Sequence, residues 1–385
     1  MISKSEIVVH NTTYDSSEAV SYHLGAFPPT SLDLAALIMP LTDTVTALTR
    51  FDTLLRGLPN SELLLAPLRA RDAVVSSRME GTISTLEEVL RLEAEADDAE
   101  GSPLGRKDTV EVALYARALR QAERQMAEGY PLSAHLIRTA HRTLLSYGRG
   151  AEKRPGQFKT EQNYIGDRRR KRIDFIPIAP EQLEPAMDTL IRFMQDGSVQ
   201  PVLRTALAHA EFEALHPFED GNGRVGRMLI TLMLWQSGVL SAPHFFVSDY
   251  FERNKDEYIE RLRAVSSNGD WTGWCRFFMA ALQSQASENI DIVGRIQALY
   301  EGMRERLRDL LRSRWSGDVL NYIFANPIFR NSRFTRDSGI PKPTANGFTN
   351  RLVEAGILSV LKPPAGRAPG LYSFPALIEI VQDQG

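Results

Sequence analysis

The twelve residues HPFEDGNGRVGR, at positions 216–227, gather a histidine, two adjacent acids, three glycines and two arginines. The glycines match G-x-G-x-x-G, the pattern of a dinucleotide-binding turn, which requires a buried strand before it. The preceding VLRTALAHAEFEALHPF is instead rich in Ala, Leu and Glu, with apolar residues at helical spacing. The stretch is therefore predicted to connect two helices, at 201–215 and 224–238.

A metal site is a second interpretation of this region, through His209, Glu213 and His216. Their spacings of four and three residues bring them toward one face of a helix. The spacing is not that of the zinc motif H-E-x-x-H, and no further nitrogen or sulfur ligand stands nearby in the sequence. We therefore predict that His209 belongs to the core or to an interface.

A phosphate-binding loop is the third interpretation. Successive backbone N–H groups of residues 221–223, at the start of a helix, form a site for an anion. Arg224 and Arg227 lie three residues apart, so both guanidinium groups face one side of the helix, where they suit phosphate oxygens. Asp220 offers a hard oxygen for Mg²⁺, and His216 can act as a general base near neutral pH. Together these groups predict nucleotide-dependent transfer to a hydroxyl.

The stretch strongly resembles the signature of the Fic family, H-x-F-x-[DE]-G-N-G-R-x-x-R. Every specified position is matched, at His216, Phe218, Asp220, Gly221, Asn222, Gly223, Arg224 and Arg227. The resemblance implies a mainly α fold whose helical core holds the loop. It also implies a nucleotidyltransferase that moves AMP from ATP to a Tyr, Thr or Ser hydroxyl of a protein, the enzyme itself included. Gly226 matches no specified position and is expected to lie inside the helix without a special role.

The resemblance also implies a role for each residue of the loop. His216 would deprotonate the acceptor hydroxyl, Asp220 would hold Mg²⁺, and Phe218 would anchor the loop in the core. Arg224 would contact the phosphates of ATP, and Arg227 would hold the γ-phosphate. Catalytic residues are thus expected at His216, Asp220, Asn222, Arg224 and Arg227, and ATP contacts at Gly221, Asn222, Gly223, Arg224 and Arg227.

Two further segments extend the resemblance. PGQFKTEQNYIGDRRRKRIDFIPIAP, residues 155–180, predicts a β-hairpin whose tip carries the basic run 168–172. It resembles the family's flap, which aligns a target by strand addition. The expected docking residues are Asn163, Ile165 and Gly166. In SDYFERNKDEYIERLRAV, Tyr258 is either part of the nucleoside pocket or a half-buried aromatic residue on a helix.

A second family signature, the inhibitory helix [ST]-x-x-x-E-[GN], is matched upstream by Ser76, Glu80 and Gly81. Ser76 and Glu80 are four residues apart, on one face of a helix predicted from Ser61 to Gly81. The resemblance implies that Glu80 pairs with Arg227 and occupies the guanidinium that should receive the γ-phosphate. The enzyme is therefore expected to be autoinhibited. Some relatives use this glutamate to position water for removing AMP, so a bifunctional enzyme is an open alternative.

The remaining N-terminal sequence carries weaker signals. The first fifty residues are expected to be irregular, because Pro-Pro at 28–29 and scattered Ser and Thr interrupt them. Ser84 and Glu87 predict a capping box that opens a helix. The acidic stretch 94–105 ends in breakers and predicts a linker. The expected domains are an N-terminal region (1–105), a Fic core (106–300) and a C-terminal domain (301–385).

The C-terminal segment changes in character. A helix near 317–325, a helix-turn-helix and two short strands around a Gly/Pro turn predict a winged helix. Six basic against two acidic residues between 331 and 370 give a net charge of +4. DNA binding and protein binding are equal alternatives for this module. The basic residues are Arg333, Arg336, Lys342, Arg351, Lys362 and Arg367.

Composition leaves the class of protein open but sets limits. The 385 residues have a net charge of −3 and a single cysteine, Cys275, which excludes an internal disulfide framework. No signal core or run of about 18 apolar residues is evident, so a cytoplasmic protein without a membrane contact is expected. ATP and Mg²⁺ are the expected substrate and metal, with a protein acceptor and a homodimer among the partners. The alternatives are a nucleotide-sensing DNA-binding regulator and a Fic enzyme with another nucleotide donor.

Overall fold

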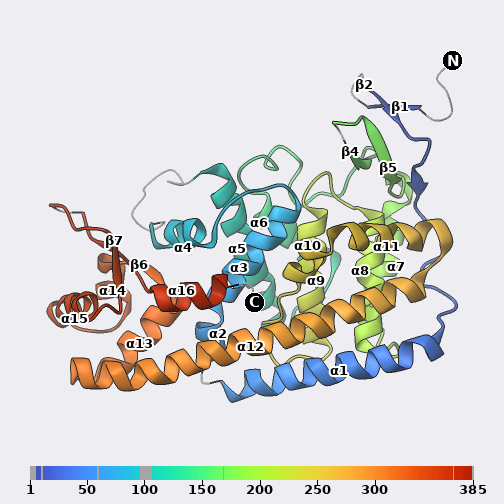
Figure 1. The fold of residues 1–385 in the computed structure, drawn as a ribbon. Helices are drawn as coiled ribbons and strands as arrows, with labels where there is room; N and C mark the ends of the chain where they lie inside the picture. The colour runs from blue at the N-terminus through green and yellow to red at the C-terminus, as the bar shows by residue number, and fades with distance from the viewer. Residues whose placement is uncertain are drawn as a thin grey trace. The chain divides into compact units, whose positions relative to one another are not determined.

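The computed structural model describes residues 6–9, 12–58, 60–95, 106–167, 169–366 and 368–383, which form sixteen helices and eight strands (Figure 1). The prediction of a mainly α protein is confirmed. The chain divides into two compact units, each built from separate segments. The first comprises Met1–Thr49, Arg117–Pro243 and Val247–Gln285, and the second comprises Arg50–Ala116, His244–Phe246 and Ala286–Gly385.

These units are not the three consecutive domains expected from the sequence. The expected boundary at 300 falls inside helix α12, Trp271–Leu311. The expected linker at 94–105 lies almost wholly outside the described residues, and helix α4 ends at Glu95. The three-domain division stays a prediction.

Two antiparallel helices, α8 and α9, form the centre of the first unit and lie side by side (Figure 1). Both are buried on nearly every face, which is typical of helices at the centre of a core. Helices α7 and α8 each begin with a proline, Pro180 and Pro201, which suits a first turn because it lacks the amide that has no partner there. The helices of this unit are α5 (Lys107–Ala127, shared with the second unit), α6 (Ala134–Leu144), α7 (Pro180–Gln195), α8 (Pro201–Leu215), α9 (Asn222–Gln236), α10 (Ser248–Arg253), α11 (Lys255–Asn268) and the first part of α12.

The prediction that the first fifty residues are irregular is wrong. Helix α1, Leu34–Gly57, contains Pro40 in its interior, and the Thr44 hydroxyl donates to the Pro40 carbonyl at 2.8 Å. Leu37, Thr44 and Leu48 are buried, so packing outweighs the low helix propensity of proline and threonine. By length and composition α1 could also cross a membrane, a test that core helices and signal sequences meet as well.

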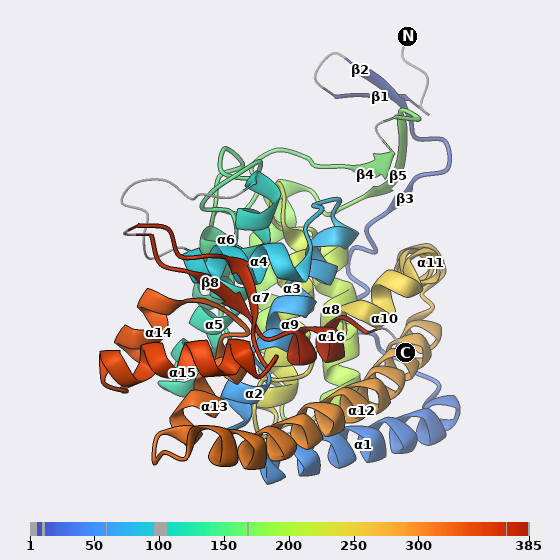
Figure 2. The same cartoon turned by 60° about the vertical axis from the view of Figure 1, so that its left-hand side comes forward.

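The first unit also carries a five-stranded sheet (Figure 2). The predicted hairpin is confirmed as antiparallel strands β4 (Ile165–Asp167) and β5 (Arg172–Ile176). At its turn the Asp167 carboxylate accepts from the Arg169 and Arg170 amides, at 2.8 and 3.1 Å. The N-terminal strands, which the sequence did not predict, are β1 (Glu6–Val9), β2 (Thr12–Asp15) and β3 (Val20–Ser21).

The helix predicted at 61–81 is two helices in the second unit, α2 (Ser61–Leu64) and α3 (Ala66–Met79). Pro67 accounts for the break, because it lacks the amide that a continuous helix would use and suits a new first turn. Helix α3 ends in a Schellman motif, with Gly81 at φ +83°. The Gly81 amide donates to Arg78 O at 2.9 Å and the Thr82 amide to Ser77 O at 3.0 Å.

The capping box of helix α4, Leu86–Glu95, lies one residue later than predicted. The Glu88 amide donates to the Thr85 hydroxyl at 3.1 Å, and the Thr85 amide donates to the Glu88 carboxylate at 3.0 Å. The hydrogen bond from the Thr85 amide, and then those from Ser84 and Arg106, hold the pKa of Glu88 below its usual range. The hydroxyl of Ser84, the expected cap, donates instead to the Glu88 carboxylate at 3.0 Å and lies 3.1 Å from the Thr109 hydroxyl.

The C-terminal part of the second unit has the order of elements expected of a winged helix. Its three strands pair antiparallel in the order β6-β8-β7, of which β6 was not predicted. The elements are α13 (Ser316–Ala325), β6 (Ile328–Arg330), α14 (Asn331–Asp337), α15 (Lys342–Glu354), β7 (Ser359–Lys362), β8 (Leu371–Ser373) and α16 (Pro375–Gln382).

Three of the six basic residues counted for this module make hydrogen bonds or ion pairs with other residues of the second unit. Arg333 donates to Glu93 O at 2.7 Å, and Arg336 pairs with Asp337 at 2.7 Å. Arg351 donates to the carbonyls of Leu310 and Leu311 at the end of α12. These three side chains stabilise contacts within the unit. The net charge of the segment therefore overstates the positive charge that could contact DNA. DNA binding stays a prediction.

Candidate active site

The motif 216–227 forms the turn from α8 into α9, as predicted. His216 ends α8: its amide donates to Phe212 O at 3.1 Å, and its backbone is left-handed at φ 47°, ψ 60°. Helix α9 begins at Asn222, two residues earlier than expected, after Gly221 at φ 78°. A left-handed histidine costs about 1–2 kcal/mol, so the surrounding contacts must hold it.

The loop is held together from within by the Asn222 side chain. Asn222 Oδ1 accepts from the Phe218 amide at 2.9 Å, and Nδ2 donates to Phe218 O at 2.8 Å. Phe218 is fully buried and stacks on His141 with ring centroids 3.7 Å apart. Asn222, expected among the catalytic residues, thus directs its side chain to the backbone of the loop, and Phe218 is the anchor that the resemblance implied.

His141, on α6, holds the loop from outside and was not singled out in the sequence. Its Nδ1 accepts from the Gly156 amide at 2.8 Å, so Nε2 carries the proton and donates to Asp220 O at 2.9 Å. Burial lowers the pKa of His141 to about 4. The neutral ring is the form that makes both hydrogen bonds.

His141 should therefore make the protein sensitive to acid. Its folded pKa of about 4 lies below the ordinary value of 6.5, so between these values the unfolded chain binds a proton that the folded chain does not. The unfolding free energy should fall by on the order of 3 kcal/mol as the pH drops from 6.5 to 4. Urea unfolding at a series of pH values measures this slope. His141→Gln, which keeps an acceptor and a donor but does not titrate, should flatten it, and equal slopes would contradict the assignment.

Asn163 and Lys159 hold the loop on its other side. Asn163 Nδ2 donates to His216 O and Phe218 O, both at 3.0 Å. Lys159 Nζ donates to Leu215 O at 3.0 Å and to Asn163 Oδ1 at 2.7 Å, and burial lowers the pKa of Lys159 to about 7. Asn163 was expected to dock a target, whereas the structure places its side chain on the motif. No local pattern in the sequence predicts these contacts, because 53 residues separate Asn163 from His216.

The charged groups of the motif gather at the start of α9. Asp220 Oδ1 accepts from the Gly221 amide at 2.6 Å and lies 3.5 Å from Arg224 Nη2. The Asp220 side chain is 32% exposed, whereas that of Arg224 is 1% exposed. Arg227 is buried one turn later. The first helical amides follow Gly221, which supplies no capping side chain, and their binding of an anion stays a prediction.

Asp220 fits a metal held chiefly by phosphates. Among the described residues no three His, Cys, Asp or Glu side chains cluster as a metal site would require. Mg²⁺ commonly takes one or two carboxylates and completes its shell with phosphate oxygens and water. One partly exposed carboxylate beside an anion site matches that donor set and does not match a zinc site.

His209 and Tyr258 form a core pair next to α9. His209 Nδ1 donates to Gly226 O at 3.1 Å, and its Nε2 accepts from the Tyr258 hydroxyl at 2.9 Å. Burial first, and then the charge of Arg227, lowers the pKa of His209 to about 3. The prediction of a core histidine is confirmed. Tyr258 is 5% exposed and directs its hydroxyl inward, which matches the packing alternative given for it.

Gly226 lies next to side chains of helix α8. A Cβ at this position would lie 2.2 Å from Glu213 Oε1 and 3.2 Å from Phe212 Cδ1, both on α8. Gly226 lies inside α9, as expected, and a side chain there would require the flexible Glu213 carboxylate to shift.

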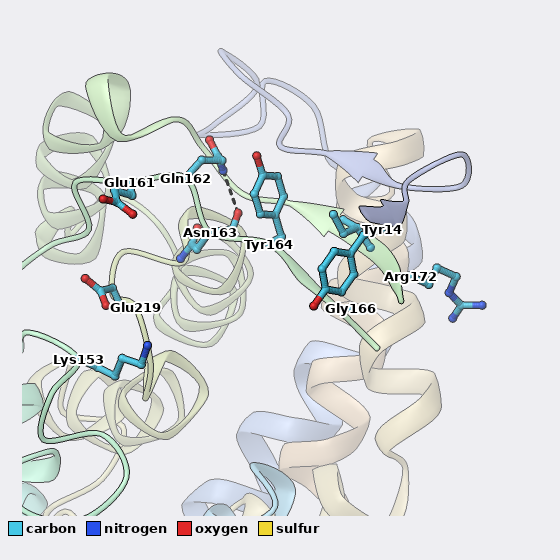
Figure 3. Close-up of a pocket in the computed structure, with 10 residues that line it drawn as sticks. Tyr14, Lys153, Glu161, Gln162, Asn163, Tyr164, Gly166, Arg172 and Glu219 are labelled. Carbon is cyan, nitrogen blue, oxygen red and sulfur yellow. Dashed lines mark hydrogen bonds between the residues drawn. The ribbon is translucent and has the colours of Figure 1, made fainter. Parts of the chain in front are cut away.

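A cleft of about 190 Å³ lies between the hairpin and the motif (Figure 3). Glu219, the residue before Asp220, lies on the same side of the view as Lys153 and Glu161, and Tyr14 and Arg172 lie on the other side (Figure 3). The cleft is lined by Tyr14, Lys153, Glu161, Gln162, Asn163, Tyr164, Gly166, Arg172, Ile173 and Glu219. Of the expected docking residues, Gly166 lines the cleft and Ile165, 36% exposed, lies next to it in β4.

The residues expected to inhibit the enzyme, Ser76, Glu80 and Gly81, belong to the second unit. Ser76, on α3, is buried. Glu80, which is the C-cap residue of this helix, is exposed. Gly81 is required there, because the left-handed conformation of the Schellman motif disfavours other residues. The pairing of Glu80 with Arg227 stays a prediction.

Comparison with known proteins supports the motif assignment. The Fic/DOC family model matches residues 131–234, and the model of the family's N-terminal region matches residues 38–124. A protein adenylyltransferase of Caenorhabditis briggsae is 32% identical over 114 residues, which are 29% of this chain and 21% of that protein. A probable protein adenylyltransferase of Aquifex aeolicus is 32% identical over 90 residues, which are 23% of this chain and 26% of that protein. The chain thus spans about a quarter or less of the length of these relatives.

A similar fold is known for a Fic family protein from Desulfovibrio desulfuricans. Its crystal structure superposes with a TM-score of 0.57 at 20% identity, covering 90% of this chain and 98% of that one. The likeness extends over both units and supports the fold. With the complete motif on the turn between α8 and α9, the chain carries a Fic/DOC domain at residues 131–234, preceded by a match to the family's N-terminal region at residues 38–124.

Proposed function

We propose that this protein transfers AMP from ATP to a side-chain hydroxyl of a protein. The observation that carries the proposal is the constrained turn at 216–227, in which a histidine, a carboxylate and an uncapped helix start converge. The matched relatives that are named protein adenylyltransferases support the same reaction. Because the chain spans only part of their length, the activity of the whole protein is our proposal.

His216 is the general base of this reaction. Its left-handed backbone lets α8 end at the motif, and Asn163 holds its carbonyl at 3.0 Å. The imidazole takes the proton of the acceptor hydroxyl as that oxygen bonds to the α-phosphorus of ATP. The bond from this phosphorus to the bridging oxygen breaks, and pyrophosphate leaves with its electron pair. The products are the AMP-modified side chain, pyrophosphate and a protonated histidine.

The start of α9 binds and orients the nucleotide. The amides of residues 222–223 and the buried Arg224 place positive charge where the phosphates lie. Arg227, one turn later, takes the γ-phosphate, as the family resemblance implies. Asp220 would hold Mg²⁺, which would supply positive charge to the phosphates.

We also propose that Glu80 restrains the enzyme by competing with ATP for Arg227. The proposal rests on the family signature at Ser76, Glu80 and Gly81, and on the exposed position of Glu80 at the end of α3. A carboxylate on that guanidinium would leave ATP in a pose unsuited to in-line attack.

Glu80→Gly is therefore expected to raise AMP transfer about tenfold or more, since removing a competitor worth about 1.4 kcal/mol changes an equilibrium tenfold. The substitution should leave α3 intact, because Glu80 caps the helix and does not lie in its interior. Mass spectrometry of the variant incubated with ATP, Mg²⁺ and cell lysate measures the result. The added mass identifies the transferred group, and the modified peptides identify the acceptors, including the chain itself.

Two glutamine variants make the comparison specific for the charge of Glu80. Glu80→Gln should also raise transfer, whereas Glu87→Gln, at an exposed position on α4, should leave it unchanged. Unchanged labelling in both Glu80 variants would contradict the proposed inhibition by Glu80. Loss of label from a purified modified protein with wild-type enzyme, but not with Glu80→Gly, would show that the glutamate also serves removal of AMP.

A further inference from the structure

The N-terminal segment 12–27, which we call the strap, is joined to the hairpin of β4 and β5, which we call the flap. Strands β2 and β3 of the strap both pair in parallel with the flap strand β5. The Asp15 amide donates to Lys171 O at 2.8 Å, and the Tyr22 amide donates to Ile176 O at 2.9 Å. The strap lies before the residues matched by either family model, which begin at residue 38. It thus lies outside the matched residues, and Figure 2 shows its strands next to β4 and β5.

A buried cluster of polar side chains also joins the strap to helix α8, which ends at His216. The Tyr22 hydroxyl donates to Glu211 Oε1 at 2.7 Å, and His23 Nε2 lies 2.8 Å from Glu211 Oε2. Because a carboxylate accepts, His23 Nε2 donates to it, and His23 Nδ1 lies 2.7 Å from the Ser266 hydroxyl. The side chains of His23 and Glu211 are 5% and 1% exposed. A carboxylate this buried depends on its donors, so the cluster forms as a unit.

The cluster links the flap to the part of the core that presents His216. Glu211 lies on α8 five residues before His216, and Ser266 lies on α11. Two further contacts fix the strap: the His23 ring meets Trp271 edge-on at 5.1 Å, and Arg263 donates to the Glu18 carbonyl. The strap therefore bridges two structures that the reaction must align, the acceptor-binding hairpin and the helix of the general base.

The strap also forms part of the cleft beside the motif. Tyr14, on β2, lines the cleft together with Tyr164 and Gly166 of the hairpin and Glu219 of the motif (Figure 3). A strap that shifts would move both Tyr14 and β5 relative to His216.

We propose that Tyr22 and His23 are positioning residues that hold the flap in register with His216 through Glu211, an inference that rests on the function proposed above. Their loss should weaken the use of the protein acceptor without weakening the use of ATP. The KM for the acceptor should rise and that for ATP should not, since the nucleotide is bound by α9 and not by the strap.

The test compares His23→Ala with His23→Gln, each in the chain that carries Glu80→Gly. Glutamine can still donate to Glu211 and accept from Ser266, so it should behave as the parent. For His23→Ala, hydrogen exchange in peptides covering 172–176 should speed up about tenfold, because one charge-assisted contact is lost. Exchange in α9, residues 222–236, should not change. With synthetic peptides that each carry one Tyr, Thr or Ser as acceptors, the acceptor KM should rise about tenfold and the ATP KM should stay within about twofold.

Tyr22→Phe, which removes a single hydroxyl, covers the case in which His23→Ala fails to fold, and should show the same pattern more weakly. Unchanged exchange at 172–176, or an equal rise in α9, would overturn the proposal. An ATP KM that rises with the acceptor KM would overturn it as well. If the parent transfers nothing to any acceptor, the proposed function fails, while the exchange data still decide whether the strap positions the flap.

Discussion

His216→Ala is expected to lower AMP transfer by about 10²–10⁴-fold, the usual contribution of a general base. The hydroxyl of the acceptor is a poor nucleophile until its proton is removed, and no second histidine belongs to the motif. The effect should fall on the rate at saturating ATP, because the phosphate-binding residues 221–227 remain in place. Single-turnover transfer from α-labelled ATP measures this rate, in the chain that carries Glu80→Gly.

Two further variants separate chemistry from folding at this position. His216→Asn keeps a residue that tolerates the left-handed backbone at φ 47° but cannot act as a base, so it should be as inactive as the alanine variant. His135→Ala, at an exposed site on α6, should be unaffected. Transfer by His216→Asn within tenfold of the parent would remove His216 from the role of base.

Phe218→Ala is expected to lower the free energy of unfolding by about 3–5 kcal/mol, as for other fully buried phenylalanines. Phe218 is 0% exposed, stacks on His141 and lies 5.4 Å from Phe158 between ring centroids. Its removal leaves a cavity beneath the loop and takes away the surface that orients the His141 ring. Chemical unfolding in urea, with the midpoint and slope fitted together, gives the change.

The control for this substitution is Tyr130→Ala, at a site that is 61% exposed. It should change the free energy of unfolding by less than about 0.5 kcal/mol. Phe218→Leu should lie between the two, because it fills part of the volume without the stacking. A loss below about 1 kcal/mol for Phe218→Ala would show that the loop is held by its hydrogen bonds alone.

Much of the helical architecture could be predicted from local sequence. The apolar spacing before and after the motif predicted α8 and α9, and the β-type runs around a polar turn predicted the flap hairpin. Gly81 predicted the end of α3, because a left-handed residue is needed there. The errors came where packing outweighs propensity: α1 continues through Pro40 because one face of it is buried.

The site was predictable only in part. The residue types of positions 216–227 were sufficient to indicate a phosphate-binding turn with a base beside it. The groups that hold this turn could not be recognised, since His141 and Asp220 are 79 residues apart and Asn163 and Phe218 are 55 apart. Contacts between distant segments leave no periodicity in the sequence. The proximity of the Glu213 carboxylate to Gly226 is likewise known only from the packing of α8 against α9.

The sequence by itself determined the mainly α class, the loop and its chemistry, because spacing along a helix and the donor types of side chains are local properties. The tertiary structure decided how that chemistry is held: a neutral His141 under Asp220, Asn163 across the motif, and a strap tied to α8 through Glu211. These contacts depend on burial, which removes water as a competing partner and makes each unpaired polar group costly. Burial is a property of the whole fold, so no stretch of the sequence could show it.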